Sequence, residues 1–483
     1  MKKISRRFFK STFLVMMCIV LAFGVVGCST KDSINDSEEQ QKEISNVSGD
    51  ISFVEEDGKV YVSLKDAFES VGGEYSEEKN EIKITKDTDE LLVNTKDKKA
   101  ILNGEEIELN DNLKIEKKVP YLSIELLNEV LDARTIFNEE ENKIEIREEM
   151  PLEYTEAFSV KYLKGGLKKI VDADGRILIF VPEGKEVPEE YKDEVIVNAP
   201  IKKVLAASTT YVSLLRPIDE IESVVAVTTD IENWAIDEVI AGLESGDITF
   251  VGKNKAPDYE KISSLKPEIA FVYGGPSGPY EMMEKFDELG IQYAVGGEYV
   301  EDHPLGRMEW LKFFAALYDK EDIAEEYFNA AVDRVKEVEE KLASVERPTV
   351  AWGSVYSGKV YVPKSVSYAA KMIEMAGGDY IFKDDDLDST SVSIEQFYDK
   401  GKDADVFVYS SSINYAPSLE YILEQTPSLA DFKKVQEKDV WCFAEDYWQS
   451  MDKTDELICQ LAAIFHPDIF DQSDITHYIK YEE

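Results

Sequence analysis

The chain has 483 residues, 43% of them hydrophobic, which allows two to four domains at about 150 residues each. Its 98 acidic residues outnumber 54 Lys and Arg and give a formal net charge of −44, which excludes nucleic acid as a partner because phosphate polymers are repelled. Three histidines and the lack of any Cys-x-x-Cys pair argue against a histidine-rich zinc site and exclude a disulfide-stapled fold.

Residues 1–27 are predicted to be a signal peptide. A basic start from Lys2 to Lys10 leads into an apolar run over residues 13–23, and small residues follow. The run is too short for a good membrane-spanning helix. The residues around Cys28 resemble a bacterial lipobox, in which this cysteine becomes the lipidated N-terminus of the mature chain. The alternative is a plain signal peptide with an incidental cysteine.

Residues 28–50 are polar and without aromatic side chains, a composition typical of a flexible tether. Because anionic lipid repels so acidic a protein, the lipid on Cys28 has to hold it at the membrane.

An internal repeat occupies residues 51–148. Residues 61–68 match residues 121–128, and residues 75–84 match residues 137–146, at an offset of about 60. Each copy is predicted to be a strand, a serine-capped short helix and a hairpin. Asn103-Gly104 predicts a further tight hairpin.

This repeat resembles the copper-amine-oxidase-like N-terminal domain, a repeated α/β module of many secreted Gram-positive proteins. The resemblance implies no copper here, because the stretch contains no His, Cys or Met ligand. We expect a spacer or a wall-facing module without catalysis.

From about residue 153 strands alternate with helices, a pattern that predicts parallel sheets with both faces covered. The first lobe is expected over residues 153–304 and the second over 346–472, followed by a tail over 473–483. Between them, residues 305–345 carry apolar side chains at helical spacing, and Lys320 to Asp322 indicate a break in this helix. The expected fold is therefore α/β, with two parallel-sheet lobes joined by a long backbone helix and preceded by the small repeated module.

Two cysteines remain for the folded part, because Cys18 leaves with the signal peptide and Cys28 carries the lipid. Cys442 and Cys459 could pair in an oxidising compartment or stay as two buried thiols, and both possibilities remain open.

Several segments together resemble class III solute-binding lipoproteins of ABC importers, of the iron-siderophore, haem and cobalamin type. The resemblance covers about residues 153–471 and rests on four segments in the family's order: Tyr259–Val272, Leu305–Tyr318, Lys371–Asp379 and Ala462–Phe470.

The resemblance implies a rather rigid clamp that captures a bulky metal chelate, with a ferric siderophore as the first expectation and cobalamin or haem as alternatives. It also implies a permease and its ATPase as partners, a monomer, no resident cofactor or metal, and a location on the outer face of a Gram-positive cytoplasmic membrane.

Ligands of such sheets bind at the carboxyl ends of the strands, where two facing lobes make a cleft. Aromatic side chains there would bury the apolar area of a chelate, and a few polar groups would orient it. The predicted ligand-binding residues are Thr209, Thr210, Tyr211, Trp234, Lys253, Tyr273, Tyr356, Tyr361, Ser411, Tyr447 and Trp448.

Members of this family often carry one glutamate per lobe that pairs with permease arginines. The first-lobe position falls near Tyr211, where there is no carboxylate, so the sequence departs from that pattern. In the second lobe, Glu445 and Asp452 are the predicted docking residues.

An enzyme is not expected, because the sequence has neither a Gly-x-Ser-x-Gly elbow nor a His-Glu-x-x-His motif, and no catalytic residues are assigned. An alternative of another class is a cell-wall-binding structural lipoprotein that acts through residues 51–148. A pulldown on purified peptidoglycan would separate that alternative from a solute-binding protein.

Overall fold

The computed structural model describes residues 51–387 and 389–482. The predicted signal peptide (residues 1–27) and the predicted tether with its lipidated Cys28 (residues 28–50) therefore lie outside the described residues. Within them, no helix has both the length and the apolar character needed to cross a bilayer.

The two copies of the N-terminal repeat pair with each other in one sheet. Its strand order is β1-β2-β9-β8, and β2 lies antiparallel to β9. Each of these two strands ends at a serine, Ser63 or Ser123, whose hydroxyl accepts a hydrogen bond from a backbone N–H of the following helix. The elements are β1 (Phe53–Glu56), β2 (Lys59–Ser63), α1 (Leu64–Ser70), β8 (Leu113–Glu116), β9 (Val119–Ser123) and α2 (Ile124–Val130).

Two further sheets complete this module. A five-stranded antiparallel meander contains the hairpin predicted at Asn103-Gly104, where both residues have positive φ, and the second copy contributes a two-stranded hairpin. Their strands are β3 (Glu74–Glu78), β4 (Glu81–Lys86), β5 (Asp89–Asn94), β6 (Lys99–Leu102), β7 (Glu105–Glu108), β10 (Arg134–Asn138) and β11 (Lys143–Arg147).

Lobe 1 is built on a five-stranded parallel sheet of order β18-β17-β16-β19-β20. Its strands are β16 (Val204–Ala206), β17 (Val224–Val227), β18 (Thr249–Phe250), β19 (Ile269–Tyr273) and β20 (Tyr293–Gly296). Its helices are α3 (Thr209–Leu215), α4 (Asp237–Ser245), α5 (Tyr259–Leu265) and α6 (Tyr280–Leu289). A four-stranded sheet precedes it, made of β12 (Ser159–Tyr162), β13 (Lys168–Val171), β14 (Ile177–Val181) and β15 (Val195–Asn198).

Lobe 2 has a mixed sheet whose centre, β21, β25 and β26, is parallel. The strands are β21 (Thr349–Tyr356), β22 (Lys359–Tyr361), β23 (Asp379–Tyr380), β24 (Ser391–Val392), β25 (Val406–Ser412), β26 (Val440–Phe443) and β27 (Tyr478–Lys480). The helices are α9 (Tyr368–Met375), α10 (Ile394–Gly401), α11 (Leu419–Gln425), α12 (Lys433–Gln436) and α13 (Thr454–Phe465). The segment expected to be a tail instead supplies β27, which pairs antiparallel with β26.

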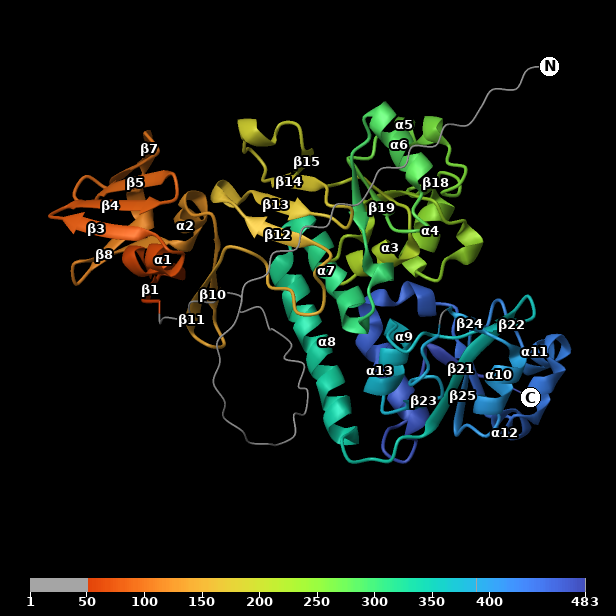
Figure 1. Cartoon of the computed structure of the whole chain (residues 1–483). Helices are drawn as coiled ribbons and strands as arrows, with labels where there is room; N and C mark the ends of the chain where they lie inside the picture. Colours follow the sequence, from red (N-terminus) through yellow and green to blue (C-terminus); the bar gives the residue numbers. More distant parts are fainter. Residues whose placement is uncertain (1–50, 388, 483) are drawn as a thin grey trace, which may run out of the picture. The chain divides into compact units, whose positions relative to one another are not determined.

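The segment expected to be the interlobe helix is two helices, α7 (Pro304–Tyr318) and α8 (Glu321–Leu342). Asp319 ends α7 in the left-handed conformation, with φ 59°, and its N–H donates to the Ala315 carbonyl. The α7 helix is buried almost entirely, mainly in the core of lobe 1. The α8 helix packs Ala324 into that core and the residues from Phe328 to Leu342 into the core of lobe 2, so α8 runs through both cores (Figure 1). Leu305 and Met308 at the start of α7 also lie in the core of lobe 2.

The predicted α/β class is thus confirmed, with two parallel-sheet lobes after a small repeated module. Cys442 and Cys459 are free thiols, and burial raises the pKa of each to about 11.

Candidate functional site at the facing strand ends

The sheet of lobe 1 reverses its strand order between β16 and β19, and polar groups gather just beyond the carboxyl ends of these two strands. The Asn254 side-chain amide donates to the Ala207 carbonyl at 2.9 Å and to the Tyr273 hydroxyl at 3.2 Å. Tyr299 lies beside them, its ring centroid 6.0 Å from that of Tyr273. Open parallel sheets bind their ligands at such a reversal point.

In lobe 2 the reversal falls between β21 and β25. The Tyr409 hydroxyl on β25 accepts a hydrogen bond from the Val355 N–H on β21 at 3.1 Å. This contact ties the two strands together immediately before Tyr356. The hairpin of β21 and β22 then presents Tyr356 and Tyr361, with ring centroids 6.2 Å apart.

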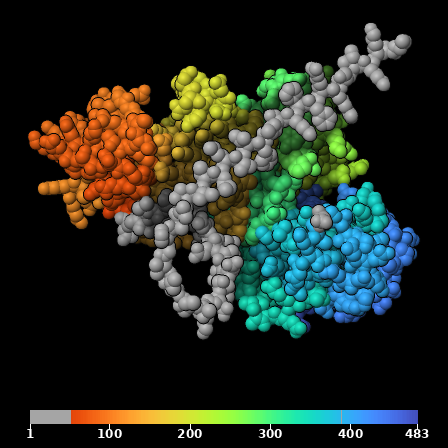
Figure 2. Space-filling view, viewed as in Figure 1, coloured from red at the N-terminus to blue at the C-terminus, as the bar shows by residue number. Residues whose placement is uncertain are grey.

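The carboxyl-end loops of the two sheets touch directly through Gln449. Its amide nitrogen donates to the Asn233 carbonyl, and its amide oxygen accepts from the Ala235 N–H, both at 2.9 Å. Asn233 and Ala235 follow β17, and Gln449 follows β26. The binding edges of the two sheets therefore face each other, and Figure 2 shows the green surface of lobe 1 meeting the blue surface of lobe 2.

A buried ion pair lies next to this contact. The Arg216 guanidinium donates to both carboxylate oxygens of Asp452, at 2.9 and 2.7 Å, and Asp452 is only 1% exposed. Burial raises the pKa of Asp452 despite the guanidinium beside it. This carboxylate is buried and joins the lobes, and its predicted role in docking a permease stays a prediction. Glu445 is exposed and stays a predicted docking residue.

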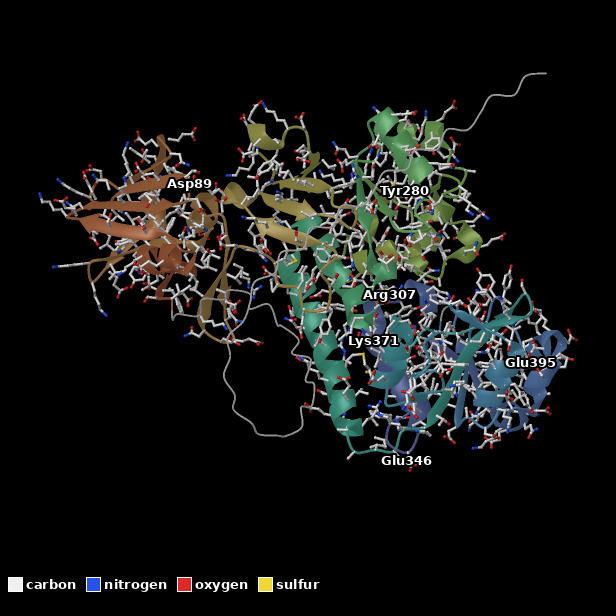
Figure 3. All side chains as sticks on the ribbon, in the orientation of Figure 1. Asp89, Tyr280, Arg307, Glu346, Lys371 and Glu395 are labelled. Atoms are coloured by element: carbon white, nitrogen blue, oxygen red, sulfur yellow. The ribbon has the colours of Figure 1, made fainter. Side chains whose placement is uncertain are left out.

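Arg307 is a cation between the lobes that the sequence interpretation missed (Figure 3). It lies in the first turns of α7, its Nε donates to the Glu298 carbonyl at 3.1 Å, and its guanidinium lies 3.9 Å from the ring centroid of Tyr368 on α9. Arg307 is 8% exposed. Arg307 could have been found from the sequence, because it is a basic residue within a run of buried helix positions and its charge requires a partner there.

The predicted residue Thr210 is the middle of a polar chain that ends in a buried carboxyl group. Its hydroxyl donates to Glu298 at 2.9 Å and lies 2.7 Å from the Ser208 hydroxyl. Glu298 is 2% exposed, burial raises its pKa, and its second oxygen, Oε2, has no hydrogen-bond partner. Thr210 thus holds Glu298 in place beneath the strand ends.

Three of the predicted aromatic residues are exposed at the strand ends of lobe 2. Tyr356 is 70% exposed, Tyr361 43% and Trp448 45%. Trp448 packs edge-on against Phe443, with ring centroids 5.5 Å apart, so its position is fixed although much of its surface is free. These side chains can accept a ligand without rearrangement of the core.

Three other predicted aromatic residues are core residues instead. Tyr211 is fully buried and donates to the Val272 carbonyl, Trp234 is 7% exposed and donates to the Thr229 carbonyl, and Tyr447 is 4% exposed and stacks on a phenylalanine at 3.8 Å. The polar group or ring face of each is used within its own lobe, and their contact with a ligand stays a prediction.

The remaining predicted ligand residues differ in accessibility. Lys253 is exposed, whereas Thr209, Tyr273 and Ser411 are partly buried. All four stay predictions.

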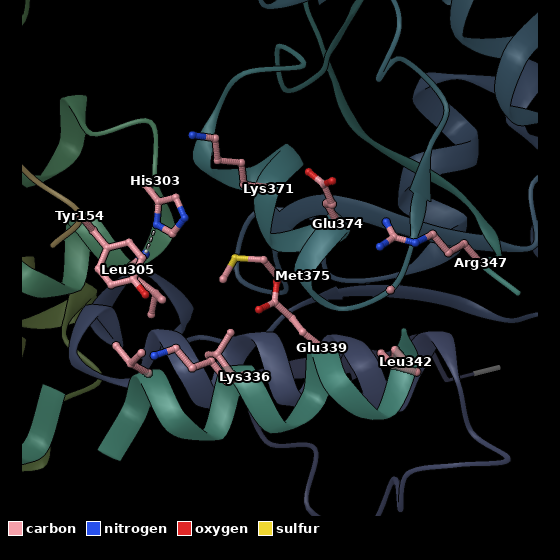
Figure 4. Close-up of a pocket in the computed structure, with 13 residues that line it drawn as sticks. Tyr154, His303, Leu305, Lys336, Glu339, Leu342, Arg347, Lys371, Glu374 and Met375 are labelled. Atoms are coloured by element: carbon pink, nitrogen blue, oxygen red, sulfur yellow. Dashed lines mark hydrogen bonds between the residues drawn. The ribbon is translucent and has the colours of Figure 1, made fainter. Parts of the chain in front are cut away.

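A cavity of about 410 Å³ lies elsewhere, between α8, α9 and the start of α7 (Figure 4). Although all eleven predicted ligand residues lie in the described part of the chain, none of them lines it. Its lining residues are Tyr154, His303, Leu305, Val332, Val335, Lys336, Glu339, Leu342, Arg347, Lys371, Glu374, Met375 and Gly377.

With this geometry established, comparison with known proteins gives the family. Residues 204–447 match the family described as periplasmic binding protein, and residues 43–146 match the copper amine oxidase N-terminal domain. The chain belongs to the periplasmic binding protein family. This binding protein is a class III solute-binding protein of the ABC-importer type, and it acts outside the cytoplasm. The prediction that it is not an enzyme is confirmed.

Two curated relatives come from Methanocaldococcus jannaschii. An uncharacterized lipoprotein is 35% identical over 327 residues, which is 65% of this binding protein and 78% of the relative. A second uncharacterized lipoprotein is 24% identical over 341 residues, 68% of this chain and 86% of the relative.

Solved structures that resemble the chain include three periplasmic binding proteins. The TroA-like protein FepB of Veillonella parvula has a TM-score of 0.47 at 18% identity and covers 65% of this chain and 99% of that chain. MolA of Haemophilus influenzae, bound to molybdate, has a TM-score of 0.47 at 16% identity and covers 63% of this chain and 93% of that chain. The vitamin B12 binding protein BtuF of Vibrio cholerae has a TM-score of 0.41 at 16% identity and covers 56% of this chain and 98% of that chain.

Proposed function

We propose that this binding protein captures a bulky metal chelate, a ferric siderophore first, at the facing strand ends and delivers it to a membrane permease. The observation that carries the proposal is the group of exposed aromatic side chains Tyr356, Tyr361 and Trp448 at the carboxyl ends of lobe 2. Aromatic rings bury a large apolar area with little loss of conformational freedom, which suits a large, partly apolar ligand.

Charge supports an anionic chelate. The protein carries a formal net charge of −44, so an anion approaches against a repulsive field unless a local cation offsets it. Arg307 supplies such a cation between the lobes, where its guanidinium has no ion pair within the described residues. Lys253 offers a second, exposed positive charge beyond β18.

Cobalamin and haem are the alternatives of the same class. Haem iron needs an axial ligand such as His, Tyr or Met. His466 and His477 are buried in lobe 2 and bonded to other groups, so haem binding at the strand ends would depend on a tyrosine such as Tyr356.

We propose that lipid on Cys28 holds the protein at the outer face of the membrane and that Glu445 contributes to docking on the permease.

Titration of tryptophan fluorescence tests the ligand class. A panel of a ferric hydroxamate, a ferric catecholate, cobalamin, haem and molybdate is added to the purified protein. We expect saturable quenching by one chelate class, with binding about tenfold or more weaker in Tyr356→Ala/Tyr361→Ala, because the exposed rings lose their contact with the ligand.

Ile115→Ala is the control, because Ile115 is 50% exposed on β8 of the N-terminal module. Trp234→Ala is unsuitable as a test of binding, since Trp234 is a core residue. The proposal would be contradicted if no compound of the panel gave saturable quenching. It would also be contradicted if the double variant bound the ligand as tightly as the unaltered protein does.

A further inference from the structure

The cavity between α8 and α9 has charged walls that the proposed function does not use. It holds about 410 Å³, within the size range of small-molecule sites. Within the described residues, none of its five charged side chains has a side-chain hydrogen bond or an ion pair: Lys336, Glu339, Arg347, Lys371 and Glu374. The described residues form many ion pairs elsewhere, so five unpaired charges around one cavity indicate a charged ligand.

The charges are arranged in order along the cavity. On α8, Glu339 follows Lys336 by three residues, and on α9, Glu374 follows Lys371 by three residues. Three residues of helix advance about 4.5 Å along the axis. In Figure 4 both helices present the lysine toward the end at His303 and the glutamate farther along, and Arg347 lies beyond the two glutamates.

The lysine end also offers a neutral hydrogen-bond donor. The Nδ1 atom of His303 accepts from the Leu305 N–H at 3.2 Å, and the ring stacks on Tyr154 with centroids 4.8 Å apart. Burial, together with the charge of Lys371, lowers the pKa of His303 to about 4. The ring is therefore neutral at pH 7, and with Nδ1 occupied as acceptor its proton lies on Nε2.

At the glutamate end Arg347 lies beyond the two carboxylates and forms an ion pair with neither of them within the described residues. Burial and the nearby Glu374 carboxylate raise the pKa of Glu339, and the positive charges of Arg347 and Lys336 offset this only in part. An ammonium group placed between the two carboxylates would relieve their mutual repulsion. Apolar side chains also line the cavity, among them Leu305, Val335 and Met375.

We propose that this cavity binds a small zwitterion, with its carboxylate at Lys336, Lys371 and His303 and its ammonium group at Glu339 and Glu374. Its short apolar body lies over Met375 and the neighbouring aliphatic residues. The site is separate from the strand ends proposed to hold the chelate and does not depend on that proposal.

Methyl NMR of the full chain labelled with ¹³C-methyl methionine tests this site. The Met375 signal is assigned from its loss in Met375→Leu, and 6-aminohexanoate, hexanoate and hexylamine are titrated separately. We expect a saturable shift of the Met375 signal with 6-aminohexanoate, and binding at least about tenfold weaker with either compound that lacks one charge.

Two variants report on the two ends. Lys371→Gln should weaken 6-aminohexanoate about tenfold, and Glu339→Gln should remove its advantage over hexanoate. Glu340→Gln, on the same helix but outside the cavity, is the matched control and should bind as the unaltered protein does. All three positions are at least partly exposed, so folding is retained and is checked by circular dichroism.

The absence of a Met375 shift at millimolar 6-aminohexanoate would overturn the proposal. So would equal affinity for the three compounds, or affinity unchanged by Lys371→Gln and Glu339→Gln.

Discussion

At the scale of single residues, His477 shows how neighbouring carboxylates set the charge state of a buried imidazole. Its Nδ1 lies 2.7 Å from Asp446 and its Nε2 lies 3.4 Å from Glu456. Burial by itself lowers the pKa of the imidazole, but hydrogen bonds to the two carboxylates outweigh burial and raise the pKa to about 9. His477 is therefore a cation at neutral pH, although its side chain is 3% exposed.

This shift predicts a pH dependence of stability. Because the folded-state pKa lies above the unfolded value of 6.5, the stabilisation is complete below pH 6.5 and is lost as pH rises through about 9. We expect the free energy of unfolding to fall by on the order of 2 kcal/mol between pH 6.5 and 9.5, and His477→Gln to lack this decrease. Urea unfolding at a series of pH values measures it.

His466→Gln is the control, since burial lowers the pKa of His466 and it does not titrate in that window. A decrease between pH 6.5 and 9.5 that is as steep in His477→Gln as in the unaltered protein would contradict the assignment.

The sequence located the binding edges of the sheets but could not tell which aromatic side chains face outward. Tyr447 and Trp448 are neighbours beyond β26, yet Tyr447 stacks inside lobe 2 and Trp448 is 45% exposed. In irregular loops no period of two or of 3.6 residues decides which side chain is buried. Arg307 escaped notice because its partners, the Glu298 carbonyl and the Tyr368 ring, come from other segments.

At the scale of elements, the break between α7 and α8 falls at the segment Lys320 to Asp322, which the sequence indicates as a break in the interlobe helix. Apolar residues continue at helical spacing on both sides, from Trp310 to Leu342. The left-handed Asp319 ends α7, and a contact far along the sequence holds it, because the buried Lys168 lies 2.7 Å from its carboxylate. Helix spacing therefore predicted the helices, whereas tertiary contacts determine where the first one ends.

The Gly-Gly pair after α9 shows what a sequence motif can encode. Gly377 has φ +77°, and a Cβ there would lie 2.7 Å from His466 Nε2 and from a Leu342 methyl group. The motif that pointed to the family thus marks a tight approach between α8, α9 and the end of α13.

The ion pair between Arg216 and Asp452 predicts a strong asymmetry between variants. Arg216→Met leaves the 1%-exposed Asp452 without a partner, so we expect the free energy of unfolding to fall by about 3 kcal/mol. Arg216→Met/Asp452→Leu should recover most of this loss, because no unpaired charge then stays buried. Chemical denaturation of both variants measures the difference.

Lys192→Met is the control, since Lys192 and its partner Glu189 are both exposed and such pairs contribute little. If Arg216→Met were no more destabilising than Lys192→Met, Asp452 would not be held as described.

At the scale of the whole described molecule, several connections cross between the lobes in addition to the contact of Arg307 with Tyr368. The α8 helix belongs to both cores, Gln449 bridges the strand-end loops, and Arg216 pairs with Asp452. Hinge closure would have to break the last two and bend the first. We therefore expect the radius of gyration from small-angle scattering to stay the same, within error, at saturating ligand, and a clear decrease would contradict a rigid clamp.

The N-terminal module also contacts the helix that joins the lobes. Arg134 and Arg147 of the module lie 2.7 and 2.6 Å from Asp322 and Glu325 in the first turns of α8. These pairs were beyond sequence analysis, because the partners are separated by more than a hundred residues. We propose that the module supports the lobes at this helix, in addition to spacing them from the membrane.

The most direct test of the binding site is the position of the metal in crystals of the chelate-loaded protein. Anomalous scattering at the iron edge locates the metal independently of the protein's own atoms. We predict a peak between Tyr356 and Trp448 of lobe 2 and Tyr273 of lobe 1. A peak on the outer surface of either lobe, or in the cavity between α8 and α9, would contradict capture at the facing strand ends.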